Sequence, residues 1–187
     1  MSEEPNKNGD HIAQATTLLA GRHVTLYSRN GWEFVSRNTR RPAVGIVAIT
    51  DDERIVLVEQ YRPPVGRLVV ELPAGLAGDV VGHEGESLLL AGQRELLEET
   101  GYAASRWTEL GAGYSSPGLT DESIVLFLAE GLQRVEAGGG DGTESITIHE
   151  PPLASVAQWL AAHGAAVDLK LWAGLFAAHE VRRARVE

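Results

Sequence analysis

The sequence has no cysteine among its 187 residues, and it has no apolar run of the length that crosses a membrane. Neither a disulfide framework nor a thiolate metal site is therefore possible. Residues 1–10 are polar, unlike a signal peptide, so we expect a cytoplasmic protein that does not bind membranes. Basic residues are in the minority, with 16 Lys and Arg against 26 Asp and Glu, which gives a formal net charge of −10. This balance argues against nucleic-acid binding, which needs clustered positive charge.

The arrangement of apolar runs and turn residues predicts one main domain with a small N-terminal extension. We predict a disordered tail over residues 1–10, an N-terminal β-hairpin region over 11–42 and the main domain over 43–187. Apolar runs and alternation predict the following elements: strands over 23–27, 32–36, 43–50, 55–60, 68–72, 106–111, 123–129 and 145–149, and helices over 86–100, 153–163 and 168–183. Strands and helices mix without regular alternation, which predicts an α+β fold.

An acidic run, RELLEETGY from Arg94 to Tyr102, is the most informative part of the chain. On a helix Glu95 and Glu99 lie one turn apart on one face, with Glu98 beside them. Like charges at this spacing repel, but a bound hard dication would turn that cost into a gain, and magnesium prefers carboxylate and phosphate oxygens. The pattern indicates metal-assisted attack on a phosphorus centre. The alternative is a solvated acidic face with an ordinary i,i+4 ion pair between Arg94 and Glu98.

This run resembles the second half of the Nudix hydrolase signature, which reads Gly, five residues, Glu, seven residues, then Arg-Glu-hydrophobic-any-Glu-Glu-any-Gly-hydrophobic. Glu86 and Arg94–Tyr102 match that pattern in full, whereas ten residues instead of five separate Gly75 from Glu86. The extra residues fall in the Gly-rich run 77–85, which reads as a loop that tolerates insertion. The resemblance implies a Nudix-like mixed β-sheet sandwich flanked by helices, with Mg²⁺ as cofactor and Mn²⁺ as the other ion that fits.

The resemblance implies roles for single residues of the acidic run. Glu95 and Glu99 would be the principal metal ligands, with Glu98 as a third or water-mediated ligand. Arg94 would orient the carboxylates through charge-assisted hydrogen bonds. Glu86 would support the cluster from outside the ligand set.

Three other strings, ELPAG, EQYRPP and SSPG with a following Glu, are similar to the ADP-ribose and nucleoside-diphosphate-sugar pyrophosphatase branch of the family. In that branch the backbone carbonyl that matches Ala74 is a metal ligand. Arg62 has a surface ion pair as its alternative role, and Pro117 an ordinary turn. The residues that we predict to contact substrate are Arg40, Arg41, Arg62, Glu71, Pro117 and Glu122.

Glu144, at the end of a Gly-rich stretch, matches the residue that activates the attacking water in this branch, and Glu98 is the alternative base. The predicted function is Mg-dependent hydrolysis of the pyrophosphate bond in ADP-ribose or a nucleotide sugar, which yields a nucleoside monophosphate and a sugar phosphate. The alternatives are a nucleoside-triphosphate or dinucleoside-polyphosphate hydrolase, and a non-catalytic Nudix-like module that binds a ligand.

Residues outside these strings carry weaker signals. The branch usually forms homodimers through its N-terminal strands, so we expect a homodimer in which the hairpin around Asn30-Gly31 takes part. The six histidines show no metal-ligand spacing, and we assign them to surface or strand packing. Trp32 is assigned to core packing, with stacking on a base as its alternative role.

Overall fold

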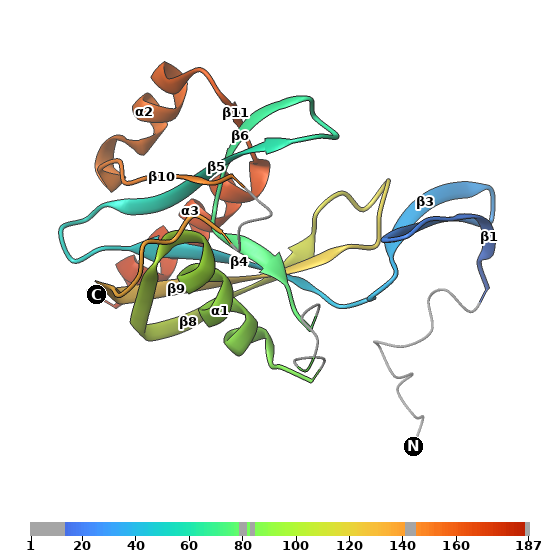
Figure 1. Cartoon of the computed structure of the whole chain (residues 1–187), viewed down its shortest axis with the longest axis horizontal. Coiled ribbons are helices and arrows are strands. Elements are labelled where there is room, and N and C mark those ends of the chain that lie inside the picture. Colours follow the sequence, from blue (N-terminus) through green and yellow to red (C-terminus); the bar gives the residue numbers. More distant parts are fainter. Residues whose placement is uncertain (1–13, 79–81, 83–84, 141–144, 186–187) are drawn as a thin grey trace. The chain divides into compact units, whose positions relative to one another are not determined.

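The computed structural model of the chain describes residues 14–78, 82, 85–140 and 145–185 (Figure 1). The predicted tail over residues 1–10 lies outside this part. None of the described helices has the length and apolar character needed to span a membrane. The chain divides into two compact units, Met1–Arg40 with Tyr114–Glu122 and Arg41–Gly113 with Ser123–Glu187, and each is described by itself.

The smaller unit contains a three-stranded antiparallel sheet in the order β1-β2-β3. Its strands are β1 (Thr16–Ala20), β2 (Val24–Arg29) and β3 (Trp32–Arg37). The predicted hairpin is confirmed, because Asn30 and Gly31 connect β2 to β3 with φ values of 51° and 83°, the left-handed conformation that a type I′ turn requires. We did not predict β1, whose five residues are all exposed and so lack the alternation of a half-buried strand.

The larger unit contains an eight-stranded mixed sheet in the order β11-β6-β5-β4-β9-β8, with β10 paired to β5 and β7 paired to β4. The central strand β4 runs parallel to β9 and antiparallel to β5. The strands are β4 (Ala43–Ile49), β5 (Ile55–Arg62), β6 (Arg67–Glu71), β7 (Ala74–Leu76), β8 (Tyr102–Tyr114), β9 (Ser123–Arg134), β10 (Thr147–His149) and β11 (Ala166–Val167). All the strands predicted here are present, and β7 and β11 are additional.

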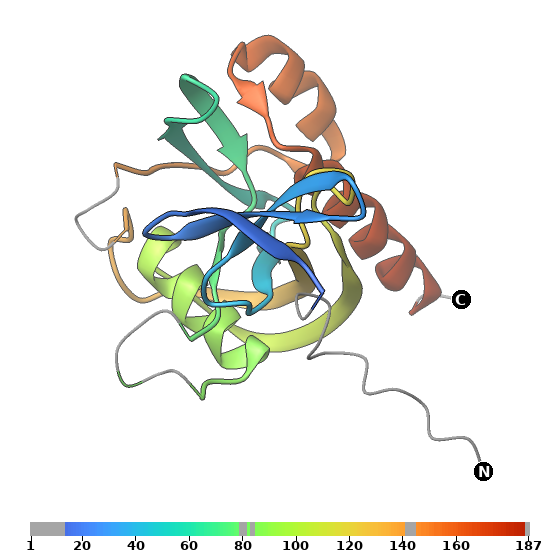
Figure 2. The same cartoon turned by 90° about the vertical axis from the view of Figure 1, so that its right-hand side faces the viewer.

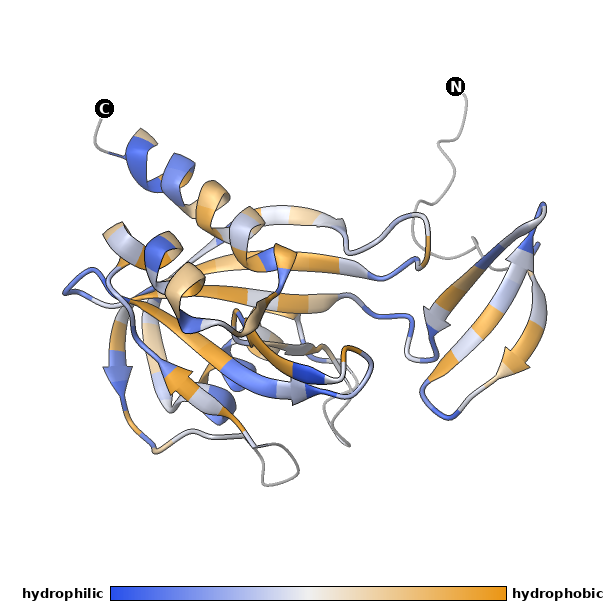
Figure 3. Ribbon diagram, turned by 90° about the horizontal axis from the view of Figure 1, so that it is seen from above, coloured by the Kyte–Doolittle hydropathy of each residue, from blue (hydrophilic) through white to orange (hydrophobic). Residues whose placement is uncertain are grey.

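Helices cover both faces of this sheet. Alternate residues of β4 point to opposite faces, and the apolar side chains on each face pack against a helix. Ile46 packs with Leu96 of α1 (Leu88–Thr100) on one face. Val47 packs with Leu160 and Leu171 on the other. Those two leucines belong to α2 (Val156–His163), which a short 3₁₀ turn, η1 (Leu153–Ser155), precedes, and to α3 (Leu169–Ala184). Figure 2 shows α1 and α3 on opposite sides of the strands, and Figure 3 shows hydrophobic residues along the strands between them. The predicted α+β sandwich is confirmed.

The helix that carries the acidic run has well-defined ends. Ser87 caps its start, because the Ser87 hydroxyl accepts a hydrogen bond from the backbone N–H of Leu90 at 3.2 Å. Gly101 ends it in the left-handed conformation, with φ 74°, and its N–H donates to the carbonyl of Leu97 at 2.8 Å. Both ends of the helix that carries the glutamates are therefore fixed by capping hydrogen bonds.

Candidate functional site

Two glutamates of α1 face the short strand β7. The side chains of Glu95 and Glu99 are on the buried side of the helix, with residue exposures of 8% and 4%. The Glu99 carboxylate accepts a hydrogen bond from the backbone N–H of Ala74 at 3.0 Å. The Glu95 carboxylate lies so close to Gly75 that a Cβ added there would be 1.9–2.4 Å from three of its atoms. The absence of a side chain at Gly75 therefore leaves room for a buried carboxylate.

Arg94 holds three carboxylates of the same segment. Its guanidinium contacts Glu86 at 3.0 Å, Glu95 at 2.8 Å and Glu98 at 3.1 Å, and it also donates to the carbonyl of Leu76 at 3.1 Å. Burial lowers the pKa of Arg94, but the hydrogen bond with Glu86 and the charges of the three glutamates outweigh burial and raise that pKa above its ordinary value. The i,i+4 pair with Glu98 is thus one contact of a larger charge cluster in which Arg94 fixes the carboxylate positions.

The loop between Gly75 and Glu86 is five residues longer than in the Nudix signature, and both of its ends contact the charge cluster around Arg94. The Glu86 carboxylate accepts from the backbone N–H of Gly78 at 2.8 Å. Arg41 donates to the backbone carbonyl of Glu86 at 2.7 Å. The ten-residue spacing is therefore compatible with the carboxylate face, since each end of the loop is bonded to residues of the cluster.

The last turn of α1 also anchors the segment that follows β9. Gly139 donates its N–H to the carbonyl of Glu99 at 2.9 Å, and Gly140 donates to the carbonyl of Glu98 at 3.0 Å. These helix-end carbonyls have no partner within the helix, so the two glycines satisfy them. The proposed base, Glu144, lies outside the described residues.

The donors on this face fit a hard divalent ion. Arg94 supplies one positive charge against the three carboxylates that it contacts, those of Glu86, Glu95 and Glu98, and Glu99 of α1 adds a fourth carboxylate. All the predicted ligand atoms, which are the carboxylates of Glu95, Glu98 and Glu99 and the carbonyl of Ala74, are oxygens. Magnesium prefers such a set of oxygen donors, whereas the metals that favour thiolate or imidazole ligands do not.

Arg62 and Glu71, both predicted to contact substrate, contact each other in this structure. Two parallel hydrogen bonds join them, from Nε at 2.7 Å and from Nη2 at 2.6 Å. The Glu71 side chain is 6% exposed and that of Arg62 is 36% exposed. The two parallel bonds hold the guanidinium in a fixed orientation, and a guanidinium held in this way suits an ion pair as well as a phosphate ligand.

Residues of the smaller unit form a pocket of about 530 Å³ that includes two predicted residues, Trp32 and Pro117. The assignment of Trp32 to core packing is wrong, because this first residue of β3 is 68% exposed. Glu122 forms an ion pair with Arg37 at 2.5 Å. Arg40 adopts a positive φ of 53° at the end of this unit.

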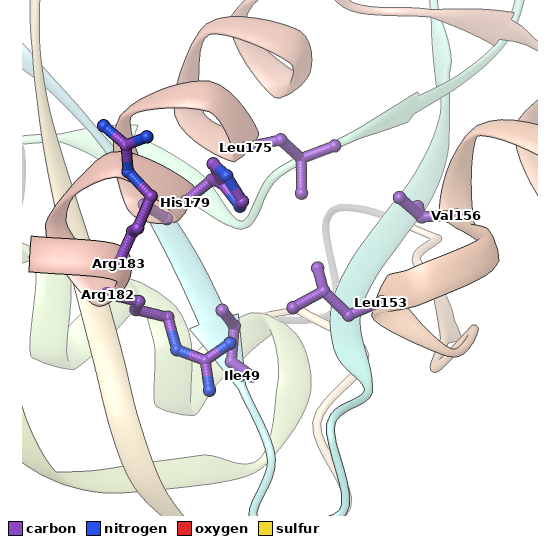
Figure 4. Close-up of a pocket in the computed structure, with 8 residues that line it drawn as sticks. Ile49, Leu153, Val156, Leu175, His179, Arg182 and Arg183 are labelled. Carbon is purple, nitrogen blue, oxygen red and sulfur yellow. The ribbon is translucent and has the colours of Figure 1, made fainter. Parts of the chain in front are cut away.

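A second pocket, of about 450 Å³, lies in the larger unit between β4, η1, α2 and α3 (Figure 4). Leu153, Val156 and Leu175 converge on it from different elements, and its lining also includes Arg182. That arginine is already paired with Glu53 and Glu130. Among the described residues, none of those predicted for catalysis, metal or substrate lines this pocket, so we do not assign it to the site.

Two histidines that we assigned to packing converge on one carboxylate. The Nε2 atoms of His149 and His163 lie 2.7 Å and 3.0 Å from the same oxygen of Glu59. Burial raises the pKa of Glu59, but hydrogen bonds from the two rings outweigh it and lower that pKa below its ordinary value. The two histidines are 90 and 104 positions from Glu59 along the chain, so no local spacing could reveal the group.

Comparisons with known proteins place these features in context. A family model for the NUDIX domain matches residues 39–175. The ADP-ribose pyrophosphatase of Bacillus subtilis (strain 168) is 44% identical over 125 residues, or 64% of this chain and 65% of that protein. The methanol dehydrogenase activator of Bacillus methanolicus is 38% identical over 133 residues, or 70% of this chain and 69% of that protein. A solved structure described as an ADP compounds hydrolase has 25% identity and a TM-score of 0.70, and the match covers 91% of this chain and 92% of that one. The chain thus spans slightly less than two thirds of the Bacillus subtilis protein.

Proposed function

Because this chain belongs to the NUDIX domain family, as its signature indicated, we propose that it is a magnesium-dependent hydrolase of the pyrophosphate bond in ADP-ribose or a related nucleotide sugar. The observation that carries the proposal is the placement of Glu95 and Glu99, two buried carboxylates of α1 that face the backbone of Ala74 and Gly75. Arg94 supplies one positive charge beside Glu95, and a bound divalent ion would compensate the further negative charge that Glu99 adds on the same helix face.

The proposed substrate class is supported by what similar proteins are called. One relative is named an ADP-ribose pyrophosphatase, and the similar solved structure is described as an ADP compounds hydrolase. In the chain itself, the pair with Glu71 fixes the orientation of the Arg62 guanidinium, a group whose geometry matches phosphate oxygens.

The carboxylates of Glu95, Glu98 and Glu99 and the carbonyl of Ala74 would hold the metal. A divalent ion bound there would supply positive charge for the pyrophosphate oxygens and lower the pKa of a bound water. The chain's own residues position these donors. Arg94 fixes the orientation of Glu95 and Glu98, and the backbone N–H of Ala74 orients Glu99. We propose that Glu144 accepts the proton of the attacking water, with Glu98 as the alternative acceptor.

Product analysis with a Mg²⁺-supplemented substrate panel tests this proposal. We expect ADP-ribose to yield AMP and ribose 5-phosphate, because attack on the pyrophosphate bond separates the two phosphorylated halves. A nucleoside-triphosphate hydrolase would instead release inorganic phosphate or pyrophosphate from ATP, and a dinucleoside-polyphosphate hydrolase would cleave that class preferentially. Binding of ADP-ribose with no turnover under any divalent ion would identify a non-catalytic module.

We also propose that two copies of the chain associate through the smaller unit. Leu18, Leu19, Val24 and Trp32 of its sheet are all exposed, and apolar side chains gathered on one small sheet are typical of an interaction surface. We expect light scattering coupled to gel filtration to give twice the monomer mass of 20.1 kDa. Replacing Leu19 by Glu should shift the protein towards the monomer, whereas a wild-type protein that stays monomeric at all concentrations would contradict this assembly.

A further inference from the structure

A group of three possible metal ligands lies away from the acidic run. The carboxylate of Glu59 and the Nε2 atoms of His149 and His163 all lie within 4.8 Å of one another. Glu59 comes from β5, His149 from β10 and His163 from the last residue of α2. Among the described residues, none of these three takes part in the contacts of Arg94 or β7. The group is thus distinct from the magnesium ligands proposed above.

The surroundings hold the two imidazoles in place. The Trp159 ring stacks on His163 with centroids 4.5 Å apart and an interplanar angle of 19°. The same ring lies 5.1 Å from His149, and the two histidine rings are 4.8 Å apart. The side chains of Glu59, His149 and His163 are 11%, 19% and 26% exposed. They are therefore largely fixed, yet solvent and a small ion can still reach them.

The protonation chemistry of the rings permits metal binding. Within the described part of the chain, neither histidine forms a hydrogen bond through Nδ1, so moving each ring proton from Nε2 to Nδ1 breaks no bond to the protein there. Both Nε2 lone pairs would then face the Glu59 oxygen. Zinc binds at about 2.0–2.2 Å from nitrogen and oxygen, which at a tetrahedral angle separates two donors by about 3.3 Å. The present separations of 2.7 Å and 3.0 Å need only a small expansion to admit the ion.

We propose that Glu59, His149 and His163 bind one zinc ion, with water at the fourth position, and that this ion fastens the end of α2 to β5 and β10. Two imidazoles and one carboxylate select zinc-class metals over magnesium, so the two metal sites of the chain would differ in selectivity. The chain has no cysteine, so no thiolate competes for the ion.

Zinc binding to the intact protein, measured by equilibrium dialysis in excess Mg²⁺, tests this proposal. We expect one tightly bound zinc per chain. His163→Phe keeps a ring against Trp159 but removes the nitrogen ligand, and Glu59→Gln keeps the side-chain shape. Each substitution should weaken zinc binding by about 100-fold or more. Losing a ligand should cost at least as much affinity as losing a residue that only orients a ligand. His179→Ala, a change at an exposed histidine of α3 outside the group, should bind zinc like the wild type.

Two further readouts separate zinc binding by this group from zinc binding by the acidic run of α1. Zinc at about 100 times the wild-type Kd should raise the Tm of the wild type by roughly 5–10 °C, and it should raise the Tm of His163→Phe by no more than about 2 °C. Cobalt substitution should give the visible absorption of a tetrahedral site in the wild type and in Glu99→Gln. The proposal is overturned if the wild type takes up no zinc, if His163→Phe and Glu59→Gln bind it as tightly as the wild type, or if Glu99→Gln abolishes binding. A circular-dichroism spectrum of each metal-free variant verifies that it is folded.

Discussion

Glu99→Gln should lower kcat for ADP-ribose by at least about 1,000-fold, which corresponds to roughly 4 kcal/mol of transition-state stabilisation. The change removes the negative charge that the proposed metal ion needs. It retains an oxygen that can accept the hydrogen bond from the backbone N–H of Ala74, at 3.0 Å in this structure. The fold should therefore persist, and steady-state kinetics over a range of Mg²⁺ concentrations measures the loss.

The matched control is Glu109→Gln, which removes the same charge from an exposed position of β8. We expect its kcat and Tm to equal those of the wild type. Turnover of Glu99→Gln at the wild-type rate in saturating Mg²⁺ would remove Glu99 from the ligand set. A large fall in the Tm of Glu99→Gln would instead assign this carboxylate a mainly structural role.

Gly75→Ala should lower kcat by at least about 100-fold while changing the Tm by only a few degrees. The added Cβ would lie 1.9–2.4 Å from the carboxylate atoms of Glu95. Since a carboxylate is the flexible end of its side chain, it can turn away at modest cost in stability, but it then leaves the position that we propose for metal binding. Misplacing a catalytic group by about 1 Å is enough to cost about 100-fold in rate.

Gly113→Ala is the matched control for this substitution, because no atom of the described residues lies within 4 Å of a Cβ added at Gly113. It should leave activity and Tm unchanged. Pairs of kinetic and thermal-unfolding measurements on the two variants provide the comparison. An active Gly75→Ala enzyme would mean that Glu95 does not need its present position, and equal losses in both variants would point to a general effect of replacing glycine.

The sequence predicted the elements whose periodicity is strong and missed those without it. The buried strands β4 and β5 were predicted because their residues form continuous apolar runs. Strand β7 was missed because it has only three residues, Ala74–Leu76, in a string whose Pro and Gly read as a turn. Its pairing with β4 depends on contacts between segments far apart in the sequence, and residue patterns do not record such contacts.

The same distinction holds for the candidate site. The positions of Glu95 and Glu99 on one face follow from helical spacing alone. That Glu95 lies against Gly75 could not be predicted, because it depends on how closely α1 approaches β7. The convergence of His149 and His163 on Glu59 was missed for the same reason, since three separate elements supply the residues. Spacing therefore predicted candidate ligands within one helix, whereas groups assembled across the sheet required the structure.

The amide groups of Gly139 and Gly140 bond to the carbonyls of Glu99 and Glu98, and Thr147–His149 pairs with β5. Backbone hydrogen bonds on both sides of residues 141–146 thus connect this stretch to the domain. None of these bonds depends on a side chain within the stretch. Variants that change the length or composition of this stretch but keep Glu144, the proposed base, should therefore be compatible with the rest of the domain, and this is the natural place to introduce a new substrate preference.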